Sequence, residues 1–225
     1  MITGAKPSII VLDTETTGLT DPIGVVELAF IEVSESLEVL QEHCTLVNPG
    51  IPVEKGAYEI HGIADADLEG KPGLQTALGV LLNEDLLVIG HNCDFDLRVI
   101  GDRLRVCGTL CTLALSRRFV TGVTNHKLGT LKQELSLPQA GDKDHNALSD
   151  ARTSLSLLRY VLDRYGLSLS TLFRWQEKPR VVHHMPWGSF EGRPLLAVPR
   201  SYRSWLLTQK LDKDLEYSLK QLENL

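Results

Sequence analysis

Two carboxylates directly follow an apolar run near the start of the chain. Residues 9–12 are continuously apolar, and Asp13 and Glu15 follow two positions apart. This pattern predicts a strand buried on both faces, and its i and i+2 spacing points both carboxylates to the same side. Two carboxylates in a partly desolvated cleft need a cation, and oxygen ligands suit Mg²⁺ or Mn²⁺. A solvated strand end is the alternative interpretation.

A histidine and a third carboxylate lie at the start of a predicted helix. Apolar residues recur at three- and four-residue spacing over residues 146–165, which is typical of an amphipathic helix. His145 then stands at the helix entrance and Asp150 in an early turn. A neutral imidazole, with a pKa of about 6.5, can accept a proton from water near neutral pH. The alternative is a surface histidine beside a helix-capping aspartate.

A fourth carboxylate follows a second apolar run. Residues 86–89 are apolar, and residues 94–104 carry apolar side chains near helical spacing. Asp96 is therefore expected in the opening turn of a helix just after a strand, facing the same end of the sheet. Asp94 is interpreted as ordinary negative charge at a helix N-terminus.

Three motifs carry these residues in a fixed order. D-T-E-T-T-G, H-N-x-x-F-D and H-x-x-x-x-D occur roughly 80 and 50 residues apart. They resemble the motifs of the DEDDh branch of the DnaQ-like 3′–5′ exonucleases. The resemblance implies an α/β, ribonuclease H-like fold, with a mixed sheet of about five strands that opens with an antiparallel meander and is flanked by helices. Further strands are expected at residues 25–33, 37–47, 86–89 and 106–110, and helices at residues 74–82 and 127–135.

The resemblance also assigns roles to the five site residues. It implies that Asp13 bridges two Mg²⁺ (or Mn²⁺) ions, that Glu15 and Asp150 bind the ion that activates water, and that Asp96 holds the second ion partly through water. It implies that His145 is the general base. The implied reaction is an in-line displacement that releases nucleoside 5′-monophosphates from 3′ ends without a covalent intermediate.

Substrate contacts are implied at positions around these motifs. By resemblance, the residues that line the terminal nucleotide are Thr16, Thr17, Gly18, Leu19, Ile60, His61 and Phe95. An apolar Leu19 at this place could pack on the last base or wedge into a duplex end. The alternatives are that Leu19 covers the core and that His61 caps a loop.

The charge is unevenly distributed along the chain. The net charge is −6, but residues 1–172 carry 14 basic and 23 acidic residues, whereas residues 173–225 carry 9 and 6. Residues 97–132 form a locally basic stretch in which Asp102 is the single acidic residue. Within it, Arg117 and Arg118 are the strongest candidates for phosphate contacts. A solvated helical face is the alternative.

The sequence predicts three parts: an exonuclease domain at residues 1–166, a linker at 167–182 and a small module at 183–225. Turn-forming prolines and glycines between residues 186 and 194, followed by Y-R-S-W-L-L, indicate a compact hairpin plus helices. This tail resembles the C-terminal module of the exodeoxyribonuclease X-type members of the family, although Trp187 and Ser189 stand where Phe and Lys are usual. The arginines of the tail, Arg193, Arg200 and Arg203, are candidate DNA contacts, and packing against the catalytic domain is the alternative.

Composition describes the expected setting. No segment resembles a signal peptide or a membrane span, which favours a soluble cytoplasmic protein, and the spacing of the four cysteines favours reduced thiols. The expected partners are single-stranded and duplex DNA 3′ ends, with RNA as an alternative and repair or replication proteins as further partners. We expect a 3′–5′ exodeoxyribonuclease acting in DNA repair or turnover. The alternatives are a polymerase III epsilon-like proofreading subunit, an RNA-trimming exoribonuclease and a non-catalytic nucleic-acid-binding adaptor.

Overall fold

The chain divides into two compact units, Met1–Phe173 and Arg174–Leu225. The computed structural model describes residues 6–81, 85–138, 146–177, 179, 181–209 and 211–223. The division falls inside helix α8 (Leu169–Glu177), within the segment expected as a linker. The segment is helical because the Ser168 hydroxyl accepts from the Thr171 amide at 3.2 Å and the side chain of Leu172 is buried.

The first unit is built on a mixed five-stranded sheet, which confirms the predicted fold class. Its strands lie in the order β3-β2-β1-β4-β5, with β1, β2 and β3 antiparallel and β4 and β5 parallel to β1. The strands are β1 (Ser8–Thr16), β2 (Val25–Val33), β3 (Val39–Leu46), β4 (Asp85–Gly90) and β5 (Arg105–Cys111).

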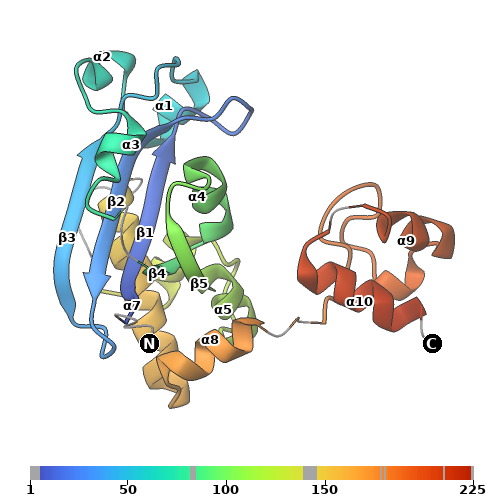
Figure 1. Cartoon of the computed structure of the whole chain (residues 1–225). Helices are drawn as coiled ribbons and strands as arrows, with labels where there is room; N and C mark the ends of the chain where they lie inside the picture. Colours follow the sequence, from blue (N-terminus) through green and yellow to red (C-terminus); the bar gives the residue numbers. More distant parts are fainter. Residues whose placement is uncertain are drawn as a thin grey trace, which may run out of the picture. The chain divides into compact units, whose positions relative to one another are not determined.

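Helices cover the sheet of the first unit (Figure 1). They are α1 (Lys55–His61), α2 (Asp65–Leu68), α3 (Leu74–Ala77), α4 (Cys93–Ile100), α5 (Thr112–Phe119), α6 (Leu128–Glu134) and α7 (Ala147–Tyr165), followed by α8. Side chains of β1, β2 and β4 form one core cluster with residues of α3 and α4, and α7 packs on β1 and β2 behind the sheet in Figure 1. The arrangement brings the starts of α4 and α7 to β1.

The predicted elements match the structure most closely in the strands. The expected strand at residues 25–33 has the bounds of β2, whereas β1 continues through Asp13 and Glu15 to Thr16 because β2 pairs with it that far. The expected helix at residues 74–82 was too long: α3 ends at Ala77, a turn follows to residue 81, and residue 82 lies outside the described residues. Helices α1, α2, α5 and α8 were not predicted.

The second unit has a small core of its own. An isolated bridge joins His184 to Pro194, followed by a 3-10 turn η1 (Leu195–Ala197) and helices α9 (Arg200–Leu206) and α10 (Lys213–Glu223). The buried apolar residues of this core are Met185, Leu195, Val198, Leu206, Leu215 and Leu219. Within the described part of the chain, no helix is long and apolar enough to cross a bilayer.

Candidate active site

The end of β1 extends beyond its parallel neighbour. Strand β4 pairs with β1 from Ser8 to Val11, whereas β2 accompanies β1 to Thr16. At the end of β4, a Cβ added to Gly90 would lie 2.8 Å from the Leu12 carbonyl oxygen, so glycine permits a close approach there. The chain then turns at Asn92, which has a φ of 74°, and enters α4 beside the end of β1.

Four carboxylates converge around this strand end. Asp13, Glu15 and Asp150 each offer a carboxylate oxygen, and these atoms lie within 4.8 Å of one another. Asp96, in the first turn of α4, is 4% exposed and accepts a hydrogen bond from the Thr14 hydroxyl at 2.7 Å. The structure therefore brings together the four carboxylates singled out in the sequence.

The environment of these groups disfavours negative charge. Burial, followed by the nearby charges of Asp96 and Asp150, raises the pKa of Asp13 well above its usual range. Burial is also the main cause that raises the pKa of Glu15 to about 8 and that of Asp96 to about 6. Clustered carboxylates with raised pKa values gain most from a bound cation, and an all-oxygen ligand set suits a hard divalent metal. The residues therefore fit a divalent metal site.

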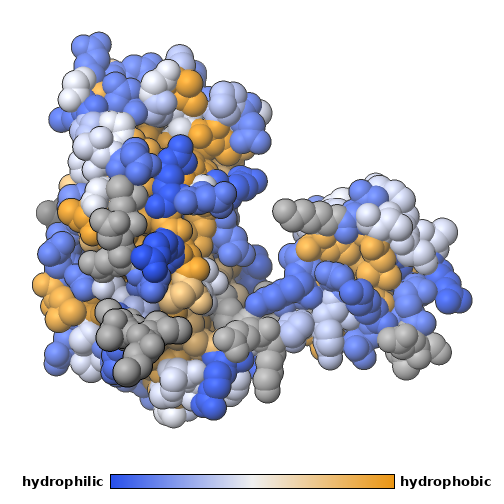
Figure 2. All heavy atoms as spheres, viewed as in Figure 1, coloured by the Kyte–Doolittle hydropathy of each residue, from blue (hydrophilic) through white to orange (hydrophobic). Residues whose placement is uncertain are grey.

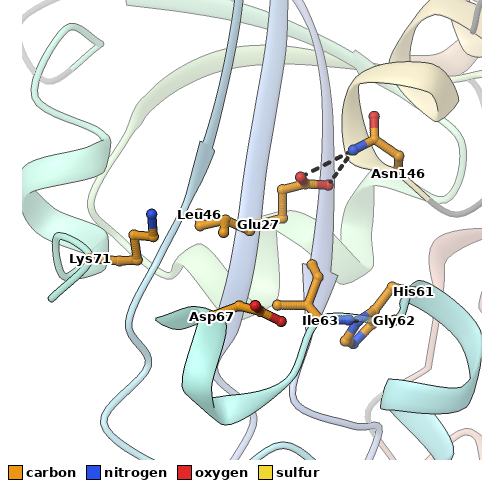
Figure 3. A pocket seen from close by; sticks show the side chains of 8 residues that line it. All are labelled: Glu27, Leu46, His61, Gly62, Ile63, Asp67, Lys71 and Asn146. Carbon is orange, nitrogen blue, oxygen red and sulfur yellow. Dashed lines mark hydrogen bonds between the residues drawn. The ribbon is translucent and has the colours of Figure 1, made fainter. Parts of the chain in front are cut away.

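A buried glutamate on β2 holds the start of α7 (Figure 3). The Asn146 amide donates to both Glu27 carboxylate oxygens at 3.1 Å, and the Ala147 backbone amide donates to Glu27 Oε2 at 2.8 Å. The Asn146 side chain also caps the helix by accepting from the Ser149 amide at 3.3 Å. Asp150 lies one turn into this helix, and His145, which directly precedes Asn146, lies outside the described residues.

The sequence analysis missed Glu27. It is 7% exposed and pairs directly with Glu15 across β1 and β2. The signal was present, because Glu27 is a lone acidic residue inside the apolar start of β2. Glu27 and Asn146 also line a pocket of about 320 Å³, together with His61, Asp67 and Lys71 (Figure 3).

Several expected nucleotide contacts hold the loop after β1 together. The Thr17 hydroxyl accepts from the Gly24 amide at 3.0 Å, and the Thr16 hydroxyl donates to the Gly18 carbonyl at 3.0 Å. His61 Nδ1 accepts from the Ile63 amide at 3.0 Å, so its Nε2 proton points to the Thr16 carbonyl at 3.2 Å. Thr16, Thr17 and His61 thus connect α1 and this loop to the end of β1.

Two other expected contacts are open to solvent. Leu19 is 79% exposed and Ile60 is also exposed, although both are large apolar side chains. Phe95 lies half-buried in α4, one residue before Asp96, and the Arg98 guanidinium lies 5.2 Å from the centre of its ring. The exposed apolar surface of Leu19 and Ile60 is available to contact a ligand.

The two arginines expected to contact phosphates lie in the last turn of helix α5. Arg117 and Arg118 are exposed, and Arg118 lies 5.8 Å from the centre of the Phe119 ring. The positive charge of Arg117 contributes to lowering the pKa of His91, although burial of the His91 ring is the main cause and brings the pKa to about 4. Helix α5 therefore places positive charge near the end of β4.

The sheet and its carboxylate cluster define a protein of the nuclease class. The model of the family described as "Exonuclease" (RNase T) matches residues 10–158, so the chain belongs to this exonuclease family. The resemblance to the DnaQ-like 3′–5′ exonucleases and the prediction of an enzyme are confirmed.

Individual relatives extend the comparison. Exodeoxyribonuclease 10 of Escherichia coli (strain K12) is 26% identical over 223 residues, which is 95% of this chain and 98% of the relative. The DNA polymerase III epsilon subunit of Rickettsia prowazekii (strain Madrid E) is 30% identical over 191 residues, covering 78% of this chain and 81% of the subunit. A solved structure of exonuclease X in complex with 5′ overhanging duplex DNA superposes with a TM-score of 0.65 at 26% identity, covering 74% of this chain and 98% of that one.

Proposed function

We propose that this chain is a two-metal 3′–5′ exodeoxyribonuclease. It removes nucleoside 5′-monophosphates from single-stranded and duplex DNA 3′ ends, in DNA repair or turnover. The observation that carries the proposal is the convergence of Asp13, Glu15 and Asp150 within 4.8 Å, beside the buried carboxylate of Asp96. The similarity to exodeoxyribonuclease 10 over 95% of the chain supports DNA as the substrate.

The four carboxylates are the proposed metal ligands. Two Mg²⁺ (or Mn²⁺) ions would supply the Lewis acidity that stabilises the attacking and leaving oxygens of an in-line displacement. Asp13 would be the ligand shared by the two ions, because the negative charges of Asp96, Asp150 and Glu15 all act on its carboxylate and raise its pKa. The Thr14 hydroxyl orients Asp96 by donating to it.

His145 is the proposed general base. It directly precedes Asn146, the residue that Glu27 fixes at the start of α7. A histidine at this helix entrance lies within a few residues of Asp150 and can take a proton from the attacking water. Glu27 is then a positioning residue, since it acts on the reaction only through the helix start.

The exposed apolar side chains of the loop after β1 and of α1 are the proposed contacts to the last nucleotide. Leu19 and Ile60 offer apolar surface on which a base can stack without regard to its identity. Phe95 contributes a third apolar group one residue from Asp96. Arg117 and Arg118 supply positive charge for the phosphates of the strand.

A proofreading subunit is the second candidate. The identity of 30% to the R. prowazekii epsilon subunit favours it, although that match covers 78% of this chain against 95% for exodeoxyribonuclease 10. The wider coverage favours a stand-alone exonuclease. Co-purification of the tagged chain with a DNA polymerase from its own cells would reverse this ranking.

The test is degradation of three 5′-labelled substrates: single-stranded DNA, blunt duplex DNA and single-stranded RNA. Each is incubated with Mg²⁺, with EDTA in place of Mg²⁺, and with the Asp13→Ala variant. We expect metal-dependent shortening of both DNA substrates from the 3′ end, with mononucleotide products, and none with Asp13→Ala. Trimming of RNA alone would identify an exoribonuclease instead, and binding without cleavage would identify an adaptor.

A further inference from the structure

The second unit carries a row of aromatic rings that begins against its core and ends at an exposed tryptophan. The Phe190 ring lies 4.8 Å from the Tyr202 ring, and the Tyr202 ring lies 5.3 Å from the Trp205 ring, centre to centre. These three residues are the aromatic row. The Trp187–Gly188 turn abuts its middle member, since a Cβ on Gly188 would lie 3.3 Å from the Tyr202 hydroxyl.

The last member of the aromatic row, Trp205, is exposed to solvent. Trp205 is 51% exposed and Trp187 is 43% exposed, while Leu206, the next residue along α9, is fully buried in the core of the unit. Figure 2 shows that hydrophobic residues reach the visible surface of this unit, bordered by hydrophilic ones; tryptophan and tyrosine are pale on this hydropathy scale and do not make up the orange area. Large exposed aromatic side chains that do not close the core are typical of binding surfaces.

The charge of this unit is opposite to that of the first. Residues 174–225 carry 9 basic and 6 acidic residues, whereas residues 1–173 carry 14 and 23. The Arg193 guanidinium lies 5.6 Å from the centre of the Phe190 ring, at the other end of the row from Trp205. A positively charged unit with exposed rings is complementary to a polyanion that presents planar groups.

The arginines of the tail have different roles. Arg203 donates to the Leu195 carbonyl at 3.3 Å and lies 3.7 Å from the Glu223 carboxylate, and its side chain is largely buried. Its expected contact with DNA is therefore replaced by a contact inside the unit. Arg193 is exposed beside the aromatic row, whereas Arg200 pairs with Glu223 at 3.2 Å.

We propose that the aromatic row and Arg193 form a binding site for single-stranded DNA in the second unit. Bases stack on Trp205 and on the neighbouring rings, and Arg193 contacts a phosphate. Single strands are favoured over duplexes because in a duplex each base is stacked between its neighbours. In a single strand the faces of the bases are free to stack on aromatic side chains. The inference rests on the proposed function for its choice of DNA, and it gives the second unit the role of retaining the strand that the first unit shortens.

The tryptophans allow binding to this unit to be followed by intrinsic fluorescence. Trp175, Trp187 and Trp205 all lie in Arg174–Leu225, and residues 1–173 contain no tryptophan. The intrinsic tryptophan emission of the full chain therefore reports on the second unit and on the end of α8. The full-length protein is titrated with oligo(dT) in EDTA, which prevents cleavage. We expect saturable quenching that weakens as salt is raised, and no matching quenching by a blunt duplex of the same length.

Substitutions locate the site. Trp205→Ala and Arg193→Gln are each expected to weaken oligo(dT) binding about tenfold, measured by the anisotropy of a labelled oligonucleotide. Tyr217→Ala is the matched control, because Tyr217 is an exposed aromatic residue of α10 outside the row. Arg193 is exposed and outside the core, so its variant tests the site even if Trp205→Ala folds poorly.

The outcomes separate this inference from the proposed function. Quenching by oligo(dT) in a protein that degrades no DNA would sustain the binding site and refute the exonuclease. Degradation of DNA with wild-type oligo(dT) affinity in both row variants would refute the binding site and sustain the exonuclease. Equal quenching by duplex and single strand, or an effect of Tyr217→Ala as large as that of Trp205→Ala, would also overturn the inference.

Discussion

The candidate site is supported in two different ways. Asp13 and Glu15 belong to β1, and each has a direct partner on β2, Ala29 and Glu27. Asp150 belongs to the first turn of α7, whose start is held to the sheet by the hydrogen bonds from Asn146 and Ala147 to Glu27. The strand carboxylates are fixed by a regular ladder, whereas the hydrogen bonds that hold the helix entrance go to one buried side chain, Glu27.

This difference separates the metal ligands on β1 from the groups at the helix entrance. A backbone ladder persists when a single side chain is changed, so the ligands on β1 tolerate changes at the helix entrance. The helix entrance has no ladder, so a change at Glu27 should shift the residues around Asn146 at the start of α7. Substitutions at the entrance should therefore alter the rate while leaving most of the metal binding intact.

The largest effect on the rate of DNA degradation is expected for a substitution of His145. His145→Ala removes the proposed base and should lower the rate of DNA degradation by about 10²–10⁴-fold. The rise in melting temperature on adding Mg²⁺ should stay as in the wild type, because the four carboxylates remain. Single-turnover assays and thermal melts measure the two quantities, with His184→Ala as the control. Loss of the Mg²⁺-dependent rise would instead make His145 a metal ligand.

The next effect is expected at Glu27. Glu27→Gln keeps the shape but turns one acceptor into a donor that faces the donors of Asn146 and Ala147, so the start of α7 should shift. We expect kcat to fall about 10–100-fold with KM nearly unchanged, as for other residues that orient a metal site. Glu32→Gln, on the same strand, is the matched control. A raised KM with normal kcat would show that Glu27 serves substrate binding instead.

A smaller effect is expected at Leu19, which follows the ladder of β1. Leu19→Ala should slow degradation of a blunt duplex about fivefold while changing the rate on single-stranded DNA less, because a stacked or wedged side chain helps to separate the last pair. Parallel time courses on the two substrates measure the ratio. Leu40→Ala, an exposed leucine of β3, is the control. An unchanged ratio would mean that Leu19 only covers the loop.

The smallest effect is a dependence of stability on pH. Burial and neighbouring charges raise the pKa of Glu15 to about 8, and that of Asp13 is also raised, so the metal-free folded state holds protons that the unfolded chain releases. Its free energy of unfolding should fall as pH rises from about 5 to 8. Mg²⁺ binds the deprotonated carboxylates and offsets this loss.

Differential scanning calorimetry measures this effect. The rise in melting temperature on adding Mg²⁺ should be larger at pH 8 than at pH 6, by about 5 °C. Samples in EDTA provide the baseline, and Asp13→Asn should reduce the difference. An equal rise at both pH values would show that the cluster does not release protons when the metal binds.

Much of the site could be predicted because its signals are local. The D-x-E pattern after an apolar run located Asp13 and Glu15, and the helical period located α7 and Asp150. The apolar run at the start of β2 hid the importance of Glu27, since its partners Asn146 and Ala147 lie 119 and 120 residues away. No local pattern reports a hydrogen bond over that distance.

The sequence by itself determined the strands, the helices that carry Asp96 and Asp150, the four carboxylates and the resemblance to the exonuclease family, because periodicity and motif residues are local properties. Tertiary structure alone decided that Glu27 fixes the entrance of α7 and that Arg203 is bound within its unit by Leu195 and Glu223. It also decided that Phe190, Tyr202 and Trp205 form one row, which ends at the exposed Trp205. These outcomes depend on which residues, distant in sequence, come together in the folded chain. Folding brings them together because buried polar groups need hydrogen-bond partners and apolar side chains pack against one another.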